Sequence, residues 1–211
     1  MLCNNIEGLF ALRYLVKPLV NLSIIGYFHF NSARLNTLEK KFSYGALFAL
    51  LLGDLFLIHD NLTLYFMLGM IMFTVGRICY SLAFSGKAHY NIDRVIPFLA
   101  VTLLFILLLI YLIIDRLEGF TIPVFSYIFL SLLMTKIAYL RKDRVNSKSY
   151  NFVMVGCIFF IISETIMVLH KFYAPLPFVS FSIMLFYSLG QYFIISGLTF
   201  QKETQGKGVF I

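Results

Sequence analysis

Six charged or strongly polar side chains lie inside segments that are otherwise apolar enough to cross a lipid bilayer. A charge near the bilayer centre costs at least about 2.5 kcal/mol. Because the set contains both signs of charge, its members must pair with one another, be hydrated or perform a function. They are Lys17, Asp54, Arg77, Lys136, Glu164 and Gln191.

Seven apolar runs occupy nearly the whole chain, and each is long enough to cross a hydrocarbon core of about 30 Å. Charged residues make up 13% of the 211 residues, whereas a soluble domain has about 25%. We therefore predict an all-α fold, a polytopic transmembrane helical bundle that forms a single domain over residues 1–211. The expected spans are 9–30, 42–59, 62–84, 94–114, 120–140, 150–170 and 176–199.

The net charge of +7 is concentrated in alternate loops and in the C-terminal tail. By the positive-inside rule, this places the N-terminus outside and the C-terminus in the cytoplasm. Short basic loops between apolar runs match anionic lipid headgroups, so we expect membrane lipids and not nucleic acid as partners. The expected location is the bacterial inner (plasma) membrane, as a multi-pass protein. The basic residues of that side are Arg34, Lys40, Lys41, Lys87, Arg94, Arg141, Lys142, Arg144, Lys148, Lys202 and Lys207.

Four of the predicted helices each present a single polar stripe by helical spacing. A lipid-facing position offers no partner for a polar group, so the stripes are expected to face the bundle interior. The stripes contain Asp54 on the second helix, Arg77 and Tyr80 on the third, Ser163 and Glu164 on the sixth, and Tyr187 and Gln191 on the seventh.

The stripes allow two interpretations. In the first, a buried network of ion pairs fixes how the helices are aligned. In the second, Asp54 and Glu164 lie in a polar cavity beside Arg77, where two carboxylates near one cation can differ in protonation, as acid–base catalysis requires. By helical rise, Arg77 is expected about 10 Å away in depth from both carboxylates. Lys17 either neutralises Asp54 or extends to the membrane surface.

No metal or cofactor is expected. The four histidines fall at predicted helix ends or in loops, and no two have the spacing of metal ligands on one helix face. The sequence also lacks a phosphate-binding loop, a nucleophile elbow and a dinucleotide fingerprint. A stripe of small residues at Gly45, Ala49 and Gly53 predicts that a neighbouring helix packs closely beside Asp54.

Several short segments follow one another in a characteristic order: KPLV at 17–20, LLGDLFL around Asp54, an aromatic series over 66–84, GCIFFIISE ending at Glu164 and YSLGQ ending at Gln191. In this order the chain resembles the YhhN-type family of integral membrane proteins, which includes mammalian lysoplasmalogenase. The resemblance implies hydrolysis of the vinyl ether bond of a lysoplasmalogen, which yields a fatty aldehyde and a glycerophospho-ethanolamine or -choline. A lysophospholipid is then the expected substrate.

Vinyl ether hydrolysis needs an acid, a carboxylate near the cation that forms, and a water molecule. We expect Asp54 and Glu164 to supply the acid and the carboxylate, in an order that the sequence leaves open. The expected supporting or substrate-binding residues are Lys17, Arg77, Tyr80, Ser163, Tyr187 and Gln191.

The chain departs from the family at three positions. The family usually has His in place of Arg77, Asp in place of Glu164 and Asn in place of His170. Glu164 keeps a carboxylate, but Arg77 removes a group that exchanges protons near neutral pH. The alternatives to an enzyme are a non-catalytic lipid-binding protein, a small proton-coupled transporter, or a structural protein whose polar stripes are fully paired.

Overall fold

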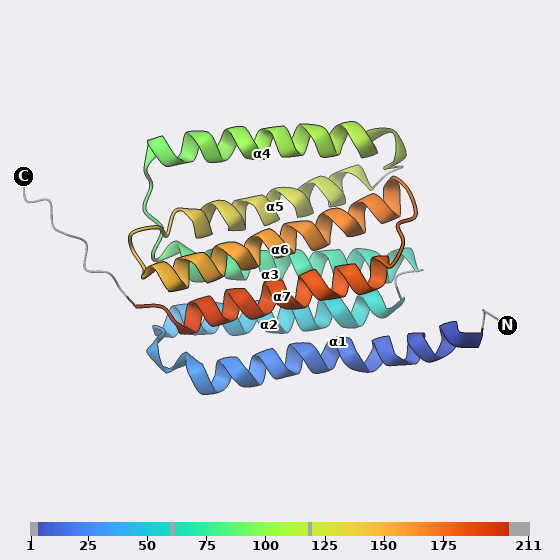
Figure 1. Ribbon diagram of the computed structural model, residues 1–211, viewed down its shortest axis with the longest axis horizontal. Coiled ribbons are helices and arrows are strands. Elements are labelled where there is room, and N and C mark those ends of the chain that lie inside the picture. The colour runs from blue at the N-terminus through green and yellow to red at the C-terminus, as the bar shows by residue number, and fades with distance from the viewer. Residues whose placement is uncertain (1–3, 60–61, 118–119, 203–211) are drawn as a thin grey trace, which may run out of the picture.

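The protein is a bundle of long helices. A computed structural model describes residues 4–59, 62–117 and 120–202, and for residues 4–17 only the helical backbone. Within these ranges the chain has seven α-helices and no strand, so the predicted helical bundle is confirmed. The helices are α1 Asn4–Asn31, α2 Thr37–Phe56, α3 Thr63–Ser85, α4 Ile92–Ile113, α5 Thr121–Tyr139, α6 Ser147–Phe172 and α7 Val179–Thr199. They overlap the seven expected ranges (Figure 1).

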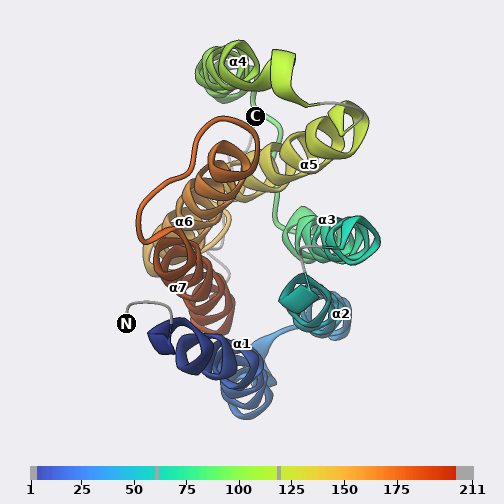
Figure 2. The same ribbon diagram turned by 90° about the vertical axis from the view of Figure 1, so that its right-hand side faces the viewer.

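The described helices form a ring with one helix outside it. Around the ring, α1 packs against α2, α2 against α3, α3 against α5, α5 against α6, α6 against α7, and α7 returns to α1. Helix α4 contacts α5 from outside the ring (Figure 2). Side chains on the inner faces of the six ring helices therefore meet in one shared interior.

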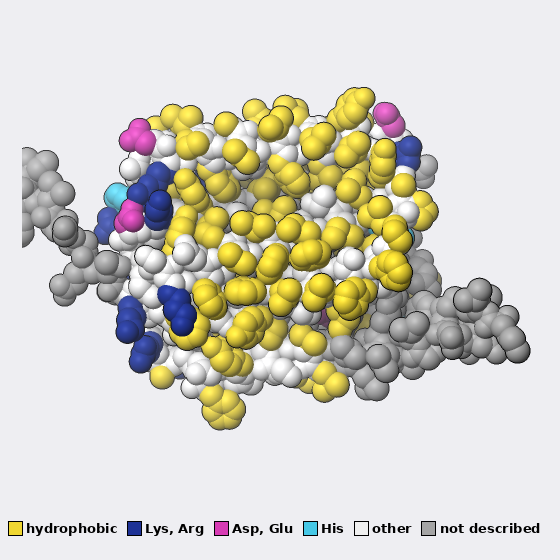
Figure 3. Space-filling model, in the orientation of Figure 1, with side chains coloured by type: hydrophobic (Ala, Val, Ile, Leu, Met, Phe, Trp, Pro, Cys, Tyr) yellow, Lys and Arg dark blue, Asp and Glu magenta, His cyan; other side chains and the backbone are white. Residues whose placement is uncertain are grey.

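Most of these helices suit a bilayer. Six of them, α2 to α7, are long and apolar enough to cross a membrane in the part of the chain that was described. Apolar side chains cover the middle of the surface, and lysines and arginines gather at one end of the bundle (Figure 3). Helix α1, which contains Arg13, Lys17 and Asn21, is not among the six. It runs alongside the others in Figure 1, and its crossing of the bilayer stays a prediction, as does the orientation of the termini.

Small residues bring neighbouring helices into close contact, as the stripe on α2 predicts. A Cβ at Gly45 would lie 3.3 Å from the Cys79 sulfur, and one at Gly53 would lie 3.2 Å from the ring of Phe73. Both neighbours belong to α3. Without lipid between them, α2 and α3 are held by direct packing, which fixes the position of Asp54 next to Gly53.

The contact between α6 and α7 is tighter still. A Cβ at Gly156 would lie 2.7 Å from the carbonyl oxygen of Gly190, so the two backbones touch at this point. Even alanine at Gly156 would force the helices apart. The contact sets the relative position of Glu164, two turns along α6, and of Gln191, which follows Gly190 on α7.

Buried polar groups tie the helices together at the basic end. Glu39 completes a capping box with Asn36 at the start of α2. Its carboxylate also accepts a hydrogen bond of 3.0 Å from the Gln201 amide, whose oxygen accepts one of 2.6 Å from Arg141. Arg141 is fully buried, and burial lowers the pKa of its guanidinium to about 10 although Glu39 acts in the opposite direction. Gln201 thus connects a buried cation to a buried anion across the end of the ring.

Candidate functional site

The four polar side chains expected in the interior are all buried in the ring. The exposed fraction is 3% for Asp54, 1% for Arg77, 7% for Glu164 and 0% for Gln191. They come from α2, α3, α6 and α7, so the four polar stripes meet inside one ring. The structure divides these side chains into two hydrogen-bonded groups.

The first group is centred on an ion pair between Arg77 and Glu164. The Arg77 Nε atom donates to Glu164 Oε1 at 2.9 Å, and its Nη2 atom donates to the same oxygen. Nε also donates to the hydroxyl of Ser131 at 3.3 Å. The Phe160 ring lies 4.2 Å from the guanidinium carbon, in cation–π contact. The Tyr127 hydroxyl interacts with both charged groups. The cation is therefore enclosed by α3, α5 and α6.

The second group is centred on Asp54. The side-chain amide of Asn21 on α1 donates a hydrogen bond to Asp54 Oδ2. The Tyr187 hydroxyl interacts with both of these residues and accepts a hydrogen bond of 2.6 Å from Gln191 Nε2. Asp54 on α2 is thus held by an amide from α1 and a phenol from α7.

Tyr187 lies between the two groups. Its ring packs edge-on against Phe73 of α3 and at an angle against Phe160 of α6, with centroids 5.7 Å apart in both cases. Its hydroxyl interacts electrostatically with both Asp54 and Arg77. The two carboxylates therefore belong to one interior but have different partners.

The remaining predicted residues lie in different settings. The side chain of Lys17 falls outside the described residues, so its relation to Asp54 is not described. Tyr80 is buried and stacks on Phe84, with centroids 6.0 Å apart. The Ser163 hydroxyl donates to the Ile183 carbonyl at 3.0 Å, so it joins α6 to α7.

Several buried polar atoms of the interior have no hydrogen-bond partner among the described residues. A buried unsatisfied polar atom costs about 1–3 kcal/mol. A polar group of a bound molecule would therefore gain the most binding free energy by forming a hydrogen bond with such an atom. They are Asn21 Oδ1, Arg77 Nη1, Tyr80 Oη and Gln191 Oε1.

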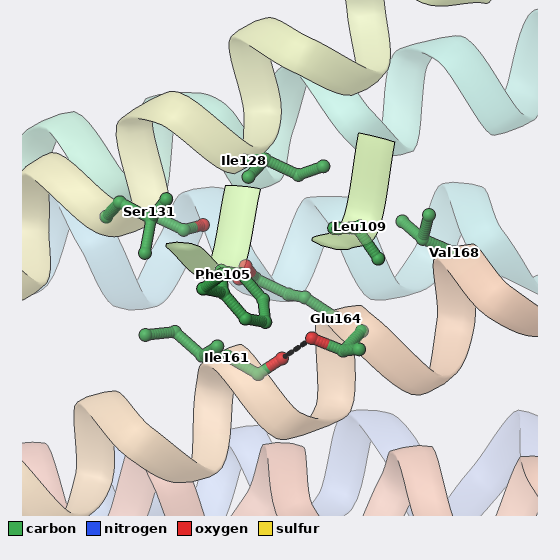
Figure 4. Close-up of a pocket in the computed structure, with 9 residues that line it drawn as sticks. Phe105, Leu109, Ile128, Ser131, Ile161, Glu164 and Val168 are labelled. Carbon is green, nitrogen blue, oxygen red and sulfur yellow. Dashed lines mark hydrogen bonds between the residues drawn. The ribbon is translucent and has the colours of Figure 1, made fainter. Parts of the chain in front are cut away.

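A small pocket of about 10 Å³, room for about one water molecule, lies beside one of the two carboxylates (Figure 4). It lies between α4, α5 and α6, and Glu164 and Ser131 form its polar part. Asp54 is not among the residues that line it. The lining residues are Phe105, Leu109, Ile128, Ser131, Leu132, Ile161, Glu164, Thr165 and Val168.

Sequence reasoning missed three members of the site, namely Asn21, Tyr127 and Ser131. Asn21 is an amide inside the first apolar run, one turn after Lys17, and that placement is a usable signal. Tyr127 and Ser131 lie four residues apart on α5, on one helix face. Serine and tyrosine are common in membrane helices, so their spacing alone did not mark them.

These features define the class of the protein: a multi-pass helical membrane protein with carboxylates, an arginine and hydroxyl groups buried in a ring of helices. The model of the YhhN family matches residues 12–198. The chain belongs to the YhhN family. No curated protein and no solved structure gives a significant match. Among the described residues, no three His, Cys, Asp or Glu side chains are grouped so as to hold a metal ion.

Proposed function

We propose that this protein hydrolyses the vinyl ether bond of lysoplasmalogens by acid–base chemistry in the ring interior. The observation that supports this best is that two buried carboxylates share one interior but have different partners. Glu164 is bonded to a guanidinium, and Asp54 to an amide and a phenol. An enzyme that needs one carboxylic acid and one carboxylate uses such a difference in surroundings.

The reaction starts with protonation of the vinyl ether at the double-bond carbon that does not carry the oxygen. The resulting oxocarbenium ion is captured by water, and the hemiacetal collapses. One water is consumed, the carbon–oxygen bond on the aldehyde side breaks, and a fatty aldehyde and a glycerophospho-alcohol are released. The step that needs most help is the first, because general acid catalysis of proton transfer is typically worth about 10²–10⁴-fold.

We assign the proton donor to Asp54 and the ionised carboxylate to Glu164. Arg77 balances the charge of Glu164 through two hydrogen bonds to one oxygen, which favours the ionised form of this carboxylate. Asn21 donates to Asp54 Oδ2, so it orients the carboxyl group that would carry the proton. The different partners of the two carboxylates support this assignment.

Supporting residues have roles consistent with this chemistry. The ring of Tyr187 lies between the two hydrogen-bonded groups, where an aromatic face would stabilise a developing cation. Gln191, with one unsatisfied oxygen, can accept a hydrogen bond from the attacking water or from the substrate glycerol. Arg77 Nη1 offers a donor to a phosphate oxygen.

The test is incubation of the purified protein, in detergent, with a lysoplasmenyl-ethanolamine and separately with an acyl lysophosphatidylethanolamine. The proposal expects fatty aldehyde from the first lipid and no fatty acid from the second. Fatty acid from the acyl lipid would indicate an ester hydrolase, and no product from either lipid would contradict the proposal.

One observation favours the second candidate, a non-catalytic lipid-binding protein. The hydrogen bonds between Arg77 and Glu164 commit both groups to each other, as in a structural ion pair. In that case a lysolipid would bind without being consumed. Equilibrium binding of a lysoplasmalogen that is recovered intact would support this alternative.

A further inference from the structure

The buried side-chain atoms that lack a hydrogen-bond partner form a series from the carboxylates to the basic end of the bundle. Eight such atoms lie among the described residues. Lipid chains offer them no partner, and each unsatisfied atom counts against a fold that is only marginally stable. Ordered water is the usual partner of such groups inside proteins. The atoms are Asn21 Oδ1, Ser43 Oγ, Arg77 Nη1, Tyr80 Oη, Arg141 Nε and Nη1, Gln191 Oε1 and Ser196 Oγ.

The residues of this series occupy successive levels along the ring helices. On α7, Ser196 lies five residues after Gln191 of the site and five before Gln201 at the basic end. On α3, Tyr80 follows Arg77 by about one turn, in the direction of the basic end. Both helices therefore carry an unsatisfied hydroxyl between the site and that end.

At the basic end, the series reaches the surface. Arg141 is fully buried and donates to Gln201 through Nη2, while its Nε and Nη1 atoms have no partner among the described residues. Gln201 donates to Glu39, whose carboxylate also accepts a hydrogen bond of 3.2 Å from the backbone of the exposed Asn36. Ser43, with its unsatisfied hydroxyl, lies about one turn beyond Glu39 on α2. Polar groups thus lead inward from solvent.

The Cys157 thiol marks the middle of the series. On α6 it lies eight residues after Ser149 and seven before Glu164. The Ser149 hydroxyl accepts a hydrogen bond of 3.4 Å from Arg141. The thiol interacts electrostatically with both Arg141 and Arg77. A buried thiol within electrostatic reach of the two arginines is a natural reporter of what lies between them.

The opposite end of the ring is packed with aromatic rings. Phe66 in the first turn of α3 lies 5.9 Å, between ring centroids, from Phe120, which precedes α5. Phe120 lies 5.8 Å from Phe172, the last residue of α6. Three ring helices are thus joined by apolar groups at this end, so we expect water to enter from the basic end.

We propose that a file of water molecules occupies the ring interior between Arg141 and Arg77 and connects the carboxylates to the basic end of the bundle. By helical rise, the stretch from Arg77 to the end of α3 at Ser85 is about 12 Å long, which a few hydrogen-bonded water molecules span. The use of this water rests on the proposed function, because hydrolysis of a vinyl ether consumes one water molecule in a site enclosed by apolar helices. The presence of the water does not rest on it.

X-ray radiolysis footprinting tests the water file, because hydroxyl radicals form from water and oxidise the side chains beside it. The purified full chain in dimyristoyl phosphatidylcholine nanodiscs is irradiated for milliseconds, and oxidation of each cysteine is measured by mass spectrometry. Three thiols are compared. Cys157 lies beside the proposed file, and Cys79 is partly exposed and packs against Gly45 of α2. The third thiol is introduced by Met70→Cys on α3, one turn from Phe66 in the apolar half, where the exposed fraction is 4%.

Serine-to-valine changes give matched variants for the same measurement. Ser43→Val and Ser196→Val each replace an unsatisfied hydroxyl of the series by apolar groups of similar size, and so remove a hydrogen-bond partner of the water. Ser23→Val is the control, because Ser23 is exposed and its hydroxyl donates to the Leu19 carbonyl of its own helix. The comparison of the three thiols needs no change in the series itself, so it stands even if a serine variant fails to fold.

We expect Cys157 to be oxidised severalfold faster than either other thiol, although its exposed fraction is 0%. Ser43→Val and Ser196→Val should each lower that rate severalfold, and Ser23→Val should leave it unchanged. Oxidation of Cys157 no faster than that of the thiol introduced by Met70→Cys would overturn the proposal, as would insensitivity to both interior serine variants. Fast oxidation of Cys157 without any aldehyde from a lysoplasmalogen would support the water file and remove the proposed hydrolysis. Aldehyde release with slow oxidation of Cys157 would do the reverse.

Discussion

Arg77 of α3 and Glu164 of α6 form a buried ion pair although 87 positions separate them in the chain. The pair fixes two helices that are not direct neighbours in the ring, because α5 lies between them. It also gives the arginine of the polar stripes to Glu164, while Asn21 is bonded to Asp54. The two carboxylates are thereby made chemically different.

The ion pair should show strong coupling in unfolding experiments. Glu164→Leu leaves the Arg77 charge buried without its anion and should cost about 3–5 kcal/mol. The double variant with Arg77→Met removes both charges and should recover most of that loss. Thermal unfolding in detergent measures both. A double variant as unstable as the sum of the two single changes would show that the pair is not coupled.

Arg77→His introduces the residue that the family usually has. Because histidine can exchange protons near neutral pH, we expect aldehyde release to be retained or raised. Arg77→Met, which keeps an unbranched side chain but removes its charge, is the control and should lower the rate. Equal loss in both variants would mean that the guanidinium itself is required.

Gln201→Leu should destabilise the basic end of the bundle. The change removes the amide that joins Arg141 to Glu39 and leaves a buried charged donor poorly satisfied. The expected cost is about 2 kcal/mol. Lys202→Leu is the control, because Lys202 is exposed. The two variants are compared by their melting temperatures in detergent. An equal decrease in both would show that the hydrogen bonds of Gln201 to Arg141 and Glu39 do not stabilise the bundle.

The orientation of the bundle can be tested at the turn before α6. Ser147 is exposed at the start of that helix, at the basic end. With Ser147→Cys as the one cysteine in a background where Cys3, Cys79 and Cys157 are replaced, we expect no modification of intact cells by an impermeant thiol reagent. Permeabilised cells should be labelled. Labelling of intact cells would place this end outside.

The sequence predicted the helices and their interior faces because long apolar runs and single polar stripes leave few alternatives in a bilayer. It did not predict which polar groups would pair. A depth estimate placed Arg77 about 10 Å from both carboxylates, a gap that an arginine side chain mostly spans, so depth did not tell Glu164 from Asp54 as its partner. Asn21 was overlooked as the partner of Asp54 because the charged Lys17 lies one turn away.

The position of α4 outside the ring was also not predicted. Residues 95–112 contain no charged side chain, and a helix that is apolar on every side suits a peripheral place among lipids. The small pocket beside Glu164 is lined by three consecutive helices, α4, α5 and α6. Such a site depends on how the helices pack, which periodicity along one helix does not report.

The central claim is tested most directly by the rate of aldehyde release from lysoplasmenyl-ethanolamine by Asp54→Asn. Asparagine keeps the size of the side chain and its hydrogen bond with Asn21 but cannot supply an acidic proton. We expect the rate to fall by about 10²–10⁴-fold while the protein remains folded. Asp115→Asn, which removes an exposed carboxylate outside the ring, should keep the parent rate. A parent rate in Asp54→Asn would contradict carboxylate catalysis in the ring.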